Sequence, residues 1–424
     1  MKKIIVVGFG KIGQAVAANV LLHGHEVVAI DSNPAVAEQF ENRIFRTNEP
    51  GLQEILTESF AAGRLAITGD YAASAGADGI IVCIPLIIDE EKKVKQEPFL
   101  QCIRSLAPNL RDKRVIVIET SIPVGFSRNE VLRVLEQEGK SHGQDFQLAH
   151  SPERIKSGTM LDQLSRIPKI IGGITEEATE DAYRLYLHFF STQILLKAGS
   201  IEAAEMLKLA GMLYRDINIA LANQLATFAT IKGINFNDLI PLINTDGEAN
   251  ILQPGIGVGG HCTPVYPHFL MENFRSAGLE FTLARESRII NNQMAEFAVS
   301  LLPKNLSPKR ALILGLSFRP NVKEDSLSTT YLLARALEKA GYDYTVHDTE
   351  FSSEEISAKG FTACQDIYQS GASVAFLVTM HAQYRDLDFR QLAASGVTHF
   401  IDGRNSVERK LVEDAGIVYQ GIGR

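Results

Sequence analysis

Short apolar runs alternate with amphipathic stretches over the first part of the chain. Each apolar run is bounded by glycine, proline or charged residues, which is typical of strands buried on both faces of a sheet. The stretches between them, such as Ser127–Gln137 and Glu176–Phe190, have a helical period. The predicted strands are Lys3–Val7, Glu26–Ile30, Arg64–Thr68, Gly79–Ile84, Arg114–Glu119, Phe146–His150 and Lys169–Gly172. This alternation predicts a doubly wound α/β domain with a parallel sheet over residues 1–196.

A single long helix is predicted over Ser200–Ile231, with Ser200 as its N-cap and Gly233 as its stop. At 1.5 Å per residue this helix spans roughly 45–50 Å, more than most globular helices need. A helix of that length usually bridges domains or forms a dimer seam. Shorter helices are predicted at Phe236–Ile243, Val265–Asn273 and Phe281–Leu301. Residues 197–302 are therefore predicted to form a central helical domain.

A second alternating segment follows the polar, proline-containing linker Pro303–Pro308. A helix is predicted at Thr330–Ala340. The predicted strands are Arg310–Gly315, Tyr344–His347, Ser373–Thr379 and Thr398–Asp402. The fold class is then α/β, with two doubly wound Rossmann-like domains, 1–196 and 303–424, joined by the long helix and a helical middle region.

A glycine-rich turn, Gly8–Gly13, joins the first predicted strand to the first helix, and the second strand ends at Asp31. Gly8 allows the tight turn, Gly10 lets the backbone approach a pyrophosphate, and Gly13 lets helix and strand pack closely. Asp31 can accept a hydrogen bond from a ribose hydroxyl. Strand, glycines, helix and acid together predict dinucleotide binding, and the absence of arginine directly after the acid favours NAD over NADP.

A second glycine-rich stretch, Gln253–Pro267, holds four glycines within six positions and Cys262 near its end. Glycine at this density indicates a shaped loop rather than a helix or strand. A thiol beside backbone amides and His261 is a candidate nucleophile. The alternative is a turn that contains a small buried cysteine, because free cysteine is among the most buried residue types.

Three loops follow predicted strands at the sheet edge where ligands bind in doubly wound folds. They are Val82–Pro85, Glu119–Gly125 and His150–Ile155. Each could be an ordinary strand-to-helix turn, and Glu153 and Arg154 could simply pair with each other at the surface.

Composition and charge narrow the classes of partner. The 424 residues are 45% hydrophobic and 22% charged, with a net charge of −8 and no basic run, which argues against nucleic acid or an anionic membrane as a partner. The chain shows no signal peptide and no apolar span of membrane length. The cysteines are scattered without metal-ligand spacing, so a reduced, cytoplasmic protein without a metal is expected. They are Cys83, Cys102, Cys262 and Cys364.

These motifs coincide in order and spacing with those of one family. The chain resembles the UDP-glucose/GDP-mannose dehydrogenase superfamily of NAD-dependent nucleotide-sugar dehydrogenases. It is most similar to the bacterial branch that oxidises UDP-N-acetylhexosamines to uronates. The matching segments are Gly8–Gly13 with Asp31, Ser121–Gly125, Ser151–Ile155, Ala204–Lys208, Asp216–Ala220, Gly255–Cys262 and Gly315–Asn321.

The resemblance implies roles for individual residues. Cys262 is the nucleophile that captures an aldehyde intermediate, and Lys208 stabilises the oxyanion or acts as a base. Glu153 assists the hydrolytic water, and Ser121 lies in the loop near it. The cofactor-binding residues are Gly8, Gly10, Lys11, Ile12, Gly13, Asp31, Pro85 and Ser121. The substrate-binding residues are Arg154, Lys208, Arg215, Asn250, Gly255, Gly259, Phe318 and Arg319. The backbone amides of Gly255–Gly260 line the nucleotide sugar, and a homodimer forms through the long helix.

Several positions depart from the family pattern. Met212 replaces an asparagine that would donate a hydrogen bond, and Tyr266 replaces the aspartate used as a water-mediated base. Tyr266 could replace that base by acting with Lys208 as an acid/base pair, or it could be a packing residue. The other departures are Ile84, Ser157, Glu248, Arg319 and Ser326.

Three interpretations remain open at this point. The protein could oxidise a nucleotide sugar to the uronate with a rebuilt site. It could act on a divergent substrate that is not a UDP-sugar, or stop at the aldehyde. It could also be a non-catalytic relative that binds NAD or a nucleotide, although such a protein has no need of a nucleophile.

Overall fold

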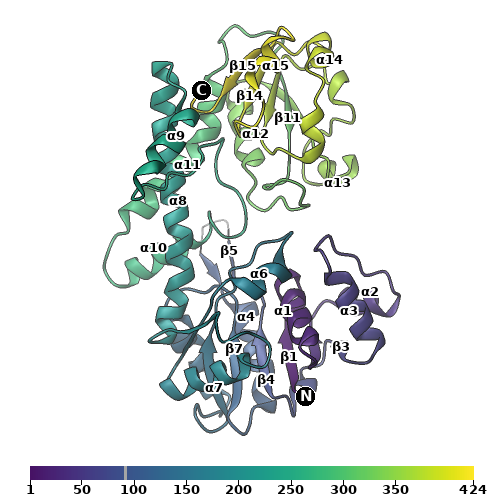
Figure 1. The fold of residues 1–424 in the computed structure, drawn as a ribbon, viewed down its shortest axis with the longest axis vertical. Coiled ribbons are helices and arrows are strands. Elements are labelled where there is room, and N and C mark those ends of the chain that lie inside the picture. Colours follow the sequence, from purple (N-terminus) through teal and green to yellow (C-terminus); the bar gives the residue numbers. More distant parts are fainter. Residues whose placement is uncertain (90–92) are drawn as a thin grey trace. The chain divides into compact units, whose positions relative to one another are not determined.

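Two open α/β sheets, one in each half of the chain, form the framework of the fold (Figure 1). The computed structural model describes residues 1–89 and 93–424. Within these residues the chain divides into two compact units, Met1–Ala210 and Gly211–Arg424. The boundary between the units falls inside the long helix α8 (Ile201–Lys232).

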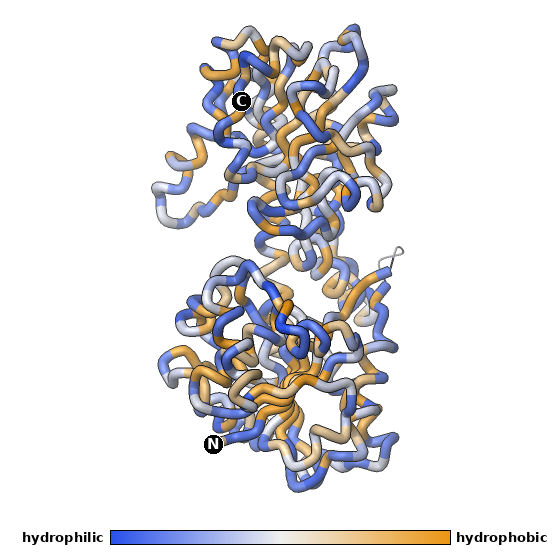
Figure 2. Tube along the Cα trace, turned by 90° about the vertical axis from the view of Figure 1, so that its right-hand side faces the viewer, coloured by the Kyte–Doolittle hydropathy of each residue, from blue (hydrophilic) through white to orange (hydrophobic). Residues whose placement is uncertain are grey.

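In the described part of the first unit, eight strands form one sheet in the order β10-β9-β8-β7-β4-β1-β2-β3. Figure 2 shows hydrophobic residues concentrated in the strands at the centre of this unit. The strands are β1 (Lys3–Val7), β2 (Glu26–Ile30), β3 (Leu65–Thr68), β4 (Gly79–Val82), β7 (Arg114–Ile118), β8 (Phe146–His150), β9 (Lys169–Gly173) and β10 (Leu195–Lys197). A small hairpin pairs β5 (Ile87–Ile88) with β6 (Val94–Lys95).

The prediction of a wholly parallel sheet is wrong at one pair. Strands β8 and β9 run antiparallel, with Ala149 opposite Gly173, whereas the other paired strands described in this sheet are parallel. Their connection contains only loops and the short helix α6 (Met160–Arg166), so the chain re-enters the sheet from the end at which it left. Strand β10 was not predicted, because it is short and mostly exposed at the edge.

Helices pack on both sides of this sheet. Helix α1 contacts α3, helices α2 and α3 lie against β3, and α7 packs on β7, β8 and β9 (Figure 1). The predicted helix at 127–137 begins as a π-helical turn, Ser127–Leu132. The predicted helix at 176–190 ends earlier, at Tyr186. Phe189 and Phe190 lie beyond this end and are buried from a turn rather than from the helix. The helices are α1 (Lys11–Leu22), α2 (Pro34–Glu41), α3 (Leu52–Ala61), α4 (Glu97–Leu106), α5 (Arg133–Gln137) and α7 (Glu176–Tyr186).

The predicted ends of the long helix are confirmed. The Ser200 hydroxyl accepts a hydrogen bond from Ala203 N at 3.1 Å, as an N-cap does. Gly233 follows the helix with a φ of +66°, a conformation that favours glycine.

Among the described residues, no helix is long and apolar enough to cross a membrane. The following helices are α9 (Phe236–Ile243), α10 (Tyr266–Ser276) and α11 (Thr282–Ser300).

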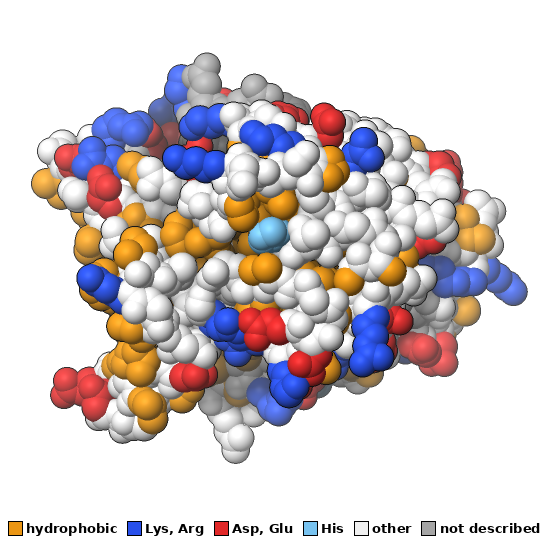
Figure 3. Space-filling model, turned by 90° about the horizontal axis from the view of Figure 1, so that it is seen from above, with side chains coloured by type: hydrophobic (Ala, Val, Ile, Leu, Met, Phe, Trp, Pro, Cys, Tyr) orange, Lys and Arg blue, Asp and Glu red, His pale blue; other side chains and the backbone are white. Residues whose placement is uncertain are grey.

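The second unit contains a parallel sheet whose described strands lie in the order β12-β11-β13-β14-β15. On the face drawn in Figure 3, Lys and Arg side chains lie among Asp and Glu side chains. The strands are β11 (Arg310–Leu314), β12 (Asp343–His347), β13 (Val374–Leu377), β14 (His399–Asp402) and β15 (Val418–Gly421). The helices are α12 (Thr329–Lys339), α13 (Ser353–Ala358), α14 (Phe389–Ala394) and α15 (Arg409–Glu413).

Candidate functional site

The glycine-rich turn has the geometry that a dinucleotide site requires. Gly8 follows β1 with a φ of +88°, and its N–H donates to Ile30 O at 2.8 Å. A Cβ on Gly13 would overlap the carbonyl oxygen of Gly8, so only glycine lets α1 pack there. A Cβ on Gly10 would meet no described atom within 4 Å. Gly10 is exposed at the N-terminus of α1, where backbone amides bind phosphate well.

Asp31 lies at the carboxyl end of β2, beside the glycine turn. Its Oδ2 accepts from Phe9 N at 2.8 Å and its Oδ1 from Asn33 N at 2.9 Å. A carboxylate has about four lone-pair sites, so acceptor capacity remains for a ribose hydroxyl. The exposed Pro85 follows Ile84, whose backbone nitrogen would lie 3.0 Å from a Cβ on Gly8. These residues fit a bound dinucleotide, with Lys11 and Ile12 opening α1 beside it.

A buried ionic cluster lies where β7, β8 and β9 meet. The Lys169 ammonium is 2.9 Å from Glu119 Oε2 and 2.6 Å from Glu153 Oε2, and the Tyr186 hydroxyl donates to Glu119 Oε1 at 2.5 Å. All three charged residues are at most 4% exposed. Burial alone would lower the pKa of Lys169, but the two carboxylates raise it above its ordinary value.

The two carboxyl groups of this cluster respond differently to the same burial. Burial raises the pKa of Glu119. Burial also acts to raise the pKa of Glu153, but Lys169, the backbone N–H of Arg154 and Lys208 lower it overall. The cluster was missed at the level of sequence. The available signal was a lysine opening an otherwise apolar strand, because a charge at such a position must be paired.

Glu153 is buried, and both of its carboxylate oxygens are bonded within the protein. Its Oε1 accepts from Arg154 N at 2.6 Å and Ile155 N at 3.0 Å, while Oε2 binds Lys169. The Arg154 guanidinium donates instead to Pro168 O, so the surface pairing of Glu153 with Arg154 is wrong. The ammonium of Lys208 on α8 donates to the backbone carbonyl of Glu153. The structure therefore brings Lys208 to Glu153 through the backbone rather than through the carboxylate.

The loop that contains Ser121 is held by a second buried acid from α8. Glu205 accepts from Gly125 N at 2.5 Å and from Ser127 N at 2.9 Å, which caps the π-helical turn. Burial raises the pKa of Glu205 to about 7. Ser121 is buried, and its hydroxyl has no hydrogen-bond partner among the described residues.

His150 ends β8 at the same edge of the sheet. It is fully buried, and neither ring nitrogen has a hydrogen-bond partner in the described part of the chain. Burial, with Lys208 and Lys169 nearby, lowers its pKa to about 3, so the ring is neutral at physiological pH.

The glycine loop of the second unit is packed against that unit's own C-terminal segments. A Cβ on Gly259 would lie 2.8 Å from Leu327 O, and one on Gly260 would lie 2.8 Å from the Phe318 ring. This close packing explains the glycines and brings Phe318 to the loop.

Three of the loop amides are already used inside the protein. Gly255 N donates to Asn223 Oδ1 at 2.9 Å, Ile256 N to Gly403 O at 3.1 Å, and Gly260 N to Ser326 O at 2.9 Å. The expectation that the amides of Gly255–Gly260 line a ligand is therefore wrong for these three.

A buried polar chain supports the start of this loop. Asp216 on α8 binds Arg288 at 2.6 Å and Asn291 at 2.8 Å, and Asn291 Oδ1 accepts from Asn223 at 2.9 Å. Asn223 in turn binds Gly255. Removing any member would leave a buried polar group unpaired, so the chain fixes where the loop begins.

Cys262 lies at the far end of the loop and is half-buried. Its carbonyl accepts from Val265 N at 3.1 Å and Tyr266 N at 3.0 Å, which places it just before α10. Tyr266 is buried, and its ring lies 5.6 Å from the Phe269 ring. Of the other predicted substrate residues, Arg319 is half-buried, and Arg215 and Asn250 are exposed.

The fold and these sites define an NAD-dependent dehydrogenase with a thiol-bearing second unit. The sequence profiles of the UDP-glucose/GDP-mannose dehydrogenase family match the chain in order. The NAD binding domain matches residues 2–190, the central domain 202–293 and the UDP binding domain 312–409. The chain belongs to this family, and it is an NAD-dependent nucleotide-sugar dehydrogenase.

Relatives support the same assignment. The UDP-N-acetyl-D-mannosamine dehydrogenase of Pyrococcus horikoshii is 31% identical over 439 residues, covering 100% of this chain and 99% of the relative. That of Methanocaldococcus jannaschii is 30% identical over 431 residues, covering 100% and 96%. The solved structure of the Pyrococcus horikoshii UDP-D-ManNAc dehydrogenase matches with a TM-score of 0.90 and 29% identity, covering 100% of this chain and 99% of that one.

Proposed function

We propose that the protein oxidises the primary alcohol of a UDP-N-acetylhexosamine to the uronate, with UDP-N-acetyl-D-mannosamine as the first substrate to test. The observation that carries this proposal is the half-buried Cys262 at the end of a glycine loop packed against Phe318 and Ser326 of the UDP binding domain. The names of the most similar relatives support the choice of sugar.

The reaction is a four-electron oxidation that needs a covalent intermediate on the chain. Bound NAD supplies a hydride acceptor for each of the two oxidation steps. Between them, the Cys262 thiolate adds to the aldehyde carbon, and the carbonyl oxygen takes up a proton to give a thiohemiacetal. After the second oxidation the product is a thioester, and water cleaves its C–S bond to release the carboxylate and the thiol.

Lys208 and Glu153 are proposed to serve the oxygen atoms of this reaction. The ammonium of Lys208, anchored by the Glu153 carbonyl, stabilises the negative charge that develops on the substrate oxygen. Because both carboxylate oxygens of Glu153 are bonded within the protein, its contribution to the hydrolytic water is proposed to act mainly through the placement of Lys208. Ser121, whose buried hydroxyl lacks a described partner, is proposed to donate to cofactor or substrate.

Tyr266 is proposed to replace the family's aspartate as the acid/base group of the first oxidation, together with Lys208. A Tyr266→Phe variant tests this directly. It should lose alcohol oxidation while it still oxidises a supplied aldehyde, because only the first step needs the phenol. Unchanged alcohol oxidation would leave Tyr266 as a packing residue.

An exposed apolar row runs along the long helix α8. Tyr214, Leu221 and Phe228 recur every seven residues along α8 and are 55%, 47% and 57% exposed. A recurring exposed apolar row on a long helix is suited to pairing with the same row of a second copy. We propose a homodimer through this face.

We also propose that the chain divides into three domains, residues 1–196, 197–302 and 303–424.

The test of the substrate is NADH formation with UDP-N-acetylmannosamine, UDP-N-acetylglucosamine, UDP-glucose and GDP-mannose at matched concentrations. The proposal predicts the highest kcat/KM for an N-acetylated UDP-sugar. A preference for a substrate without UDP would favour the divergent-substrate alternative, and no turnover with intact NAD binding would favour a binding role.

A further inference from the structure

The same local arrangement of glycine and aspartate occurs once in each unit. Gly8 after β1 and Gly315 after β11 have φ values of +88° and +107°. Each donates its N–H at 2.8 Å to the residue that ends the next strand, Gly8 to Ile30 and Gly315 to His347. An aspartate follows that strand in both cases, Asp31 in the first unit and Asp348 in the second.

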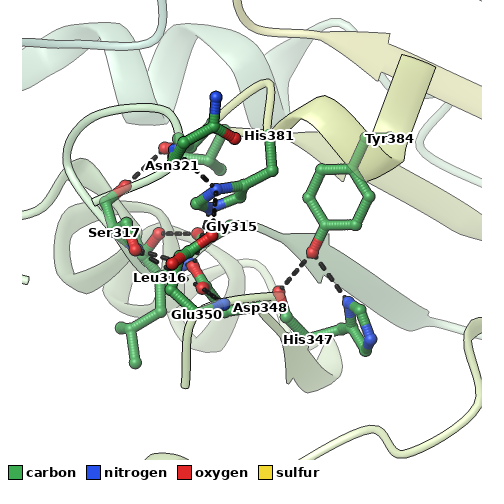
Figure 4. A network of polar contacts seen from close by, with 12 residues as sticks. Gly315, Leu316, Ser317, Asn321, His347, Asp348, Glu350, His381 and Tyr384 are labelled. Carbon is green, nitrogen blue, oxygen red and sulfur yellow. Dashed lines mark hydrogen bonds and ion pairs between the residues drawn. The ribbon is translucent and has the colours of Figure 1, made fainter. Parts of the chain in front are cut away.

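The two aspartates differ in how many hydrogen bonds their carboxylates accept from the protein. Asp348 is 4% exposed, and its Oδ2 accepts from Leu316 N at 2.6 Å, Ser317 N at 2.8 Å and His381 Nε2 at 3.1 Å. Its Oδ1 accepts from Glu350 N at 2.7 Å. Figure 4 shows the carboxylate pointing into this ring of donors. Asp348 is therefore turned inward and does not serve a ribose as Asp31 can.

His381 holds the far end of residues 315–321, the segment whose first residues bind Asp348. It is fully buried, and its Nδ1 accepts from Asn321 N at 3.0 Å (Figure 4). Because Nδ1 accepts there, the ring proton sits on Nε2 and is donated to Asp348. Asn321 has a φ of +56°, and its Oδ1 accepts from Ala382 N at 2.8 Å. Residues 315–321 are thus held at their start by Asp348 and at their end by His381.

The held segment contains Phe318 and Arg319, and the glycine loop rests on it. Gly259 and Gly260 pack so closely on Phe318 that a Cβ on either would lie 3.0 Å or less from its side chain. A shift of Phe318 must therefore move the loop that ends at Cys262, because the packing leaves no space between them.

We infer that Asp348 and His381 are positioning residues, which hold residues 315–321, and through Phe318 the cysteine-bearing loop, in the shape that nucleotide-sugar binding requires. This inference rests on the proposed function. Neither residue touches the reacting atoms in this assignment, so their loss acts on substrate binding more than on chemistry.

The test uses the full chain with Asp348→Asn, His381→Phe and the milder His381→Gln. Tyr344→Phe is the matched control, because it removes a hydroxyl of the same unit that donates to Glu338 Oε1 at 2.7 Å, away from residues 315–321. The KM for the UDP-sugar should rise at least tenfold in Asp348→Asn and His381→Phe and less in His381→Gln. The value of kcat should change under threefold, NAD affinity should stay constant, and Tyr344→Phe should match wild type.

Two further readouts separate this inference from the proposed function. Amide hydrogen exchange should accelerate at Leu316 and Ser317 in Asp348→Asn, and calorimetry should show a parallel loss of affinity for UDP, even if no sugar in the panel is oxidised. Unchanged KM, exchange and UDP affinity in Asp348→Asn and His381→Phe would overturn the inference. An equal loss of NAD affinity, or a wild-type protein that binds no UDP, would also overturn it.

Discussion

Replacing Lys169 by methionine tests the buried ionic cluster of the first unit. The Lys169 ammonium lies 2.9 Å from Glu119 and 2.6 Å from Glu153, in a site where all three residues are at most 4% exposed. Methionine fills similar space without charge, so two carboxyl groups remain buried without their cation. Removing one partner of a buried pair typically costs about 3–5 kcal/mol of unfolding free energy.

The cost depends on pH in a direction that the cluster fixes. Without Lys169, at least one carboxyl must stay protonated in the folded state, so its folded pKa rises above its unfolded value of about 4.3. Stability is then retained below that value and lost as pH rises, at about 1.4 kcal/mol per pH unit. One such carboxyl costs about 1 kcal/mol at pH 5 and about 4 kcal/mol at pH 7 relative to acid.

The assay is native-state hydrogen exchange of β7 and β8 peptides in increasing denaturant, because the chain has two units and need not unfold in one step. Lys113→Met, which breaks the exposed contact with Glu177 at 2.7 Å, is the control and should change stability little. A loss below about 1 kcal/mol that is equal at pH 5 and pH 7 would refute an ionised cluster.

Three other changes have defined outcomes. Gly13→Ala should abolish NAD binding, because its Cβ would overlap the Gly8 carbonyl oxygen, whereas Gly10→Ala should fold normally and weaken NAD affinity at least tenfold. Calorimetry measures both affinities, and an equal loss of NAD affinity in the two variants would contradict the glycine geometry. Because burial raises the pKa of Glu205 to about 7, the folded unit holds this proton more tightly than the unfolded chain, and wild-type stability should fall as pH rises from about 5 to 7. Glu205→Gln should remove that part of the pH dependence in denaturant titrations, and an unchanged profile would disprove the assignment. Leu221→Glu with Phe228→Glu should convert a dimer to a monomer by light scattering, and an unchanged mass would exclude this face.

Much of the fold was predictable because its strands are uniformly apolar. The strands Lys3–Val7, Glu26–Ile30 and Phe146–His150 have the predicted bounds, and the long helix has the predicted N-cap, Ser200, and the predicted stop, Gly233. The direction of β9 was not predictable, because strand periodicity is the same for parallel and antiparallel pairing. The end of α7 was missed because buried phenylalanines continue the apolar pattern through a turn.

The candidate site was predictable where glycine geometry decides it, and less so where buried polar groups do. Gly8, Gly13 and Asp31 take the positions expected from spacing alone. The partners of Glu153 and Asp348 come from other segments of the chain, so only the folded structure shows that Lys169 and His381 bind them. Spacing identified Asp31 and Glu153, but it did not show whether their oxygens face a ligand or the protein.

The central claim is that Cys262 carries a four-electron oxidation of a UDP-N-acetylhexosamine. The most direct measurement is the number of NADH molecules formed per sugar consumed, in wild type and in Cys262→Ala, with the product mass determined in parallel. The account predicts two NADH and a uronate for wild type, and at most one NADH and no uronate for Cys262→Ala. Two NADH and a uronate from Cys262→Ala, or a wild-type reaction that ends at one NADH, would contradict it.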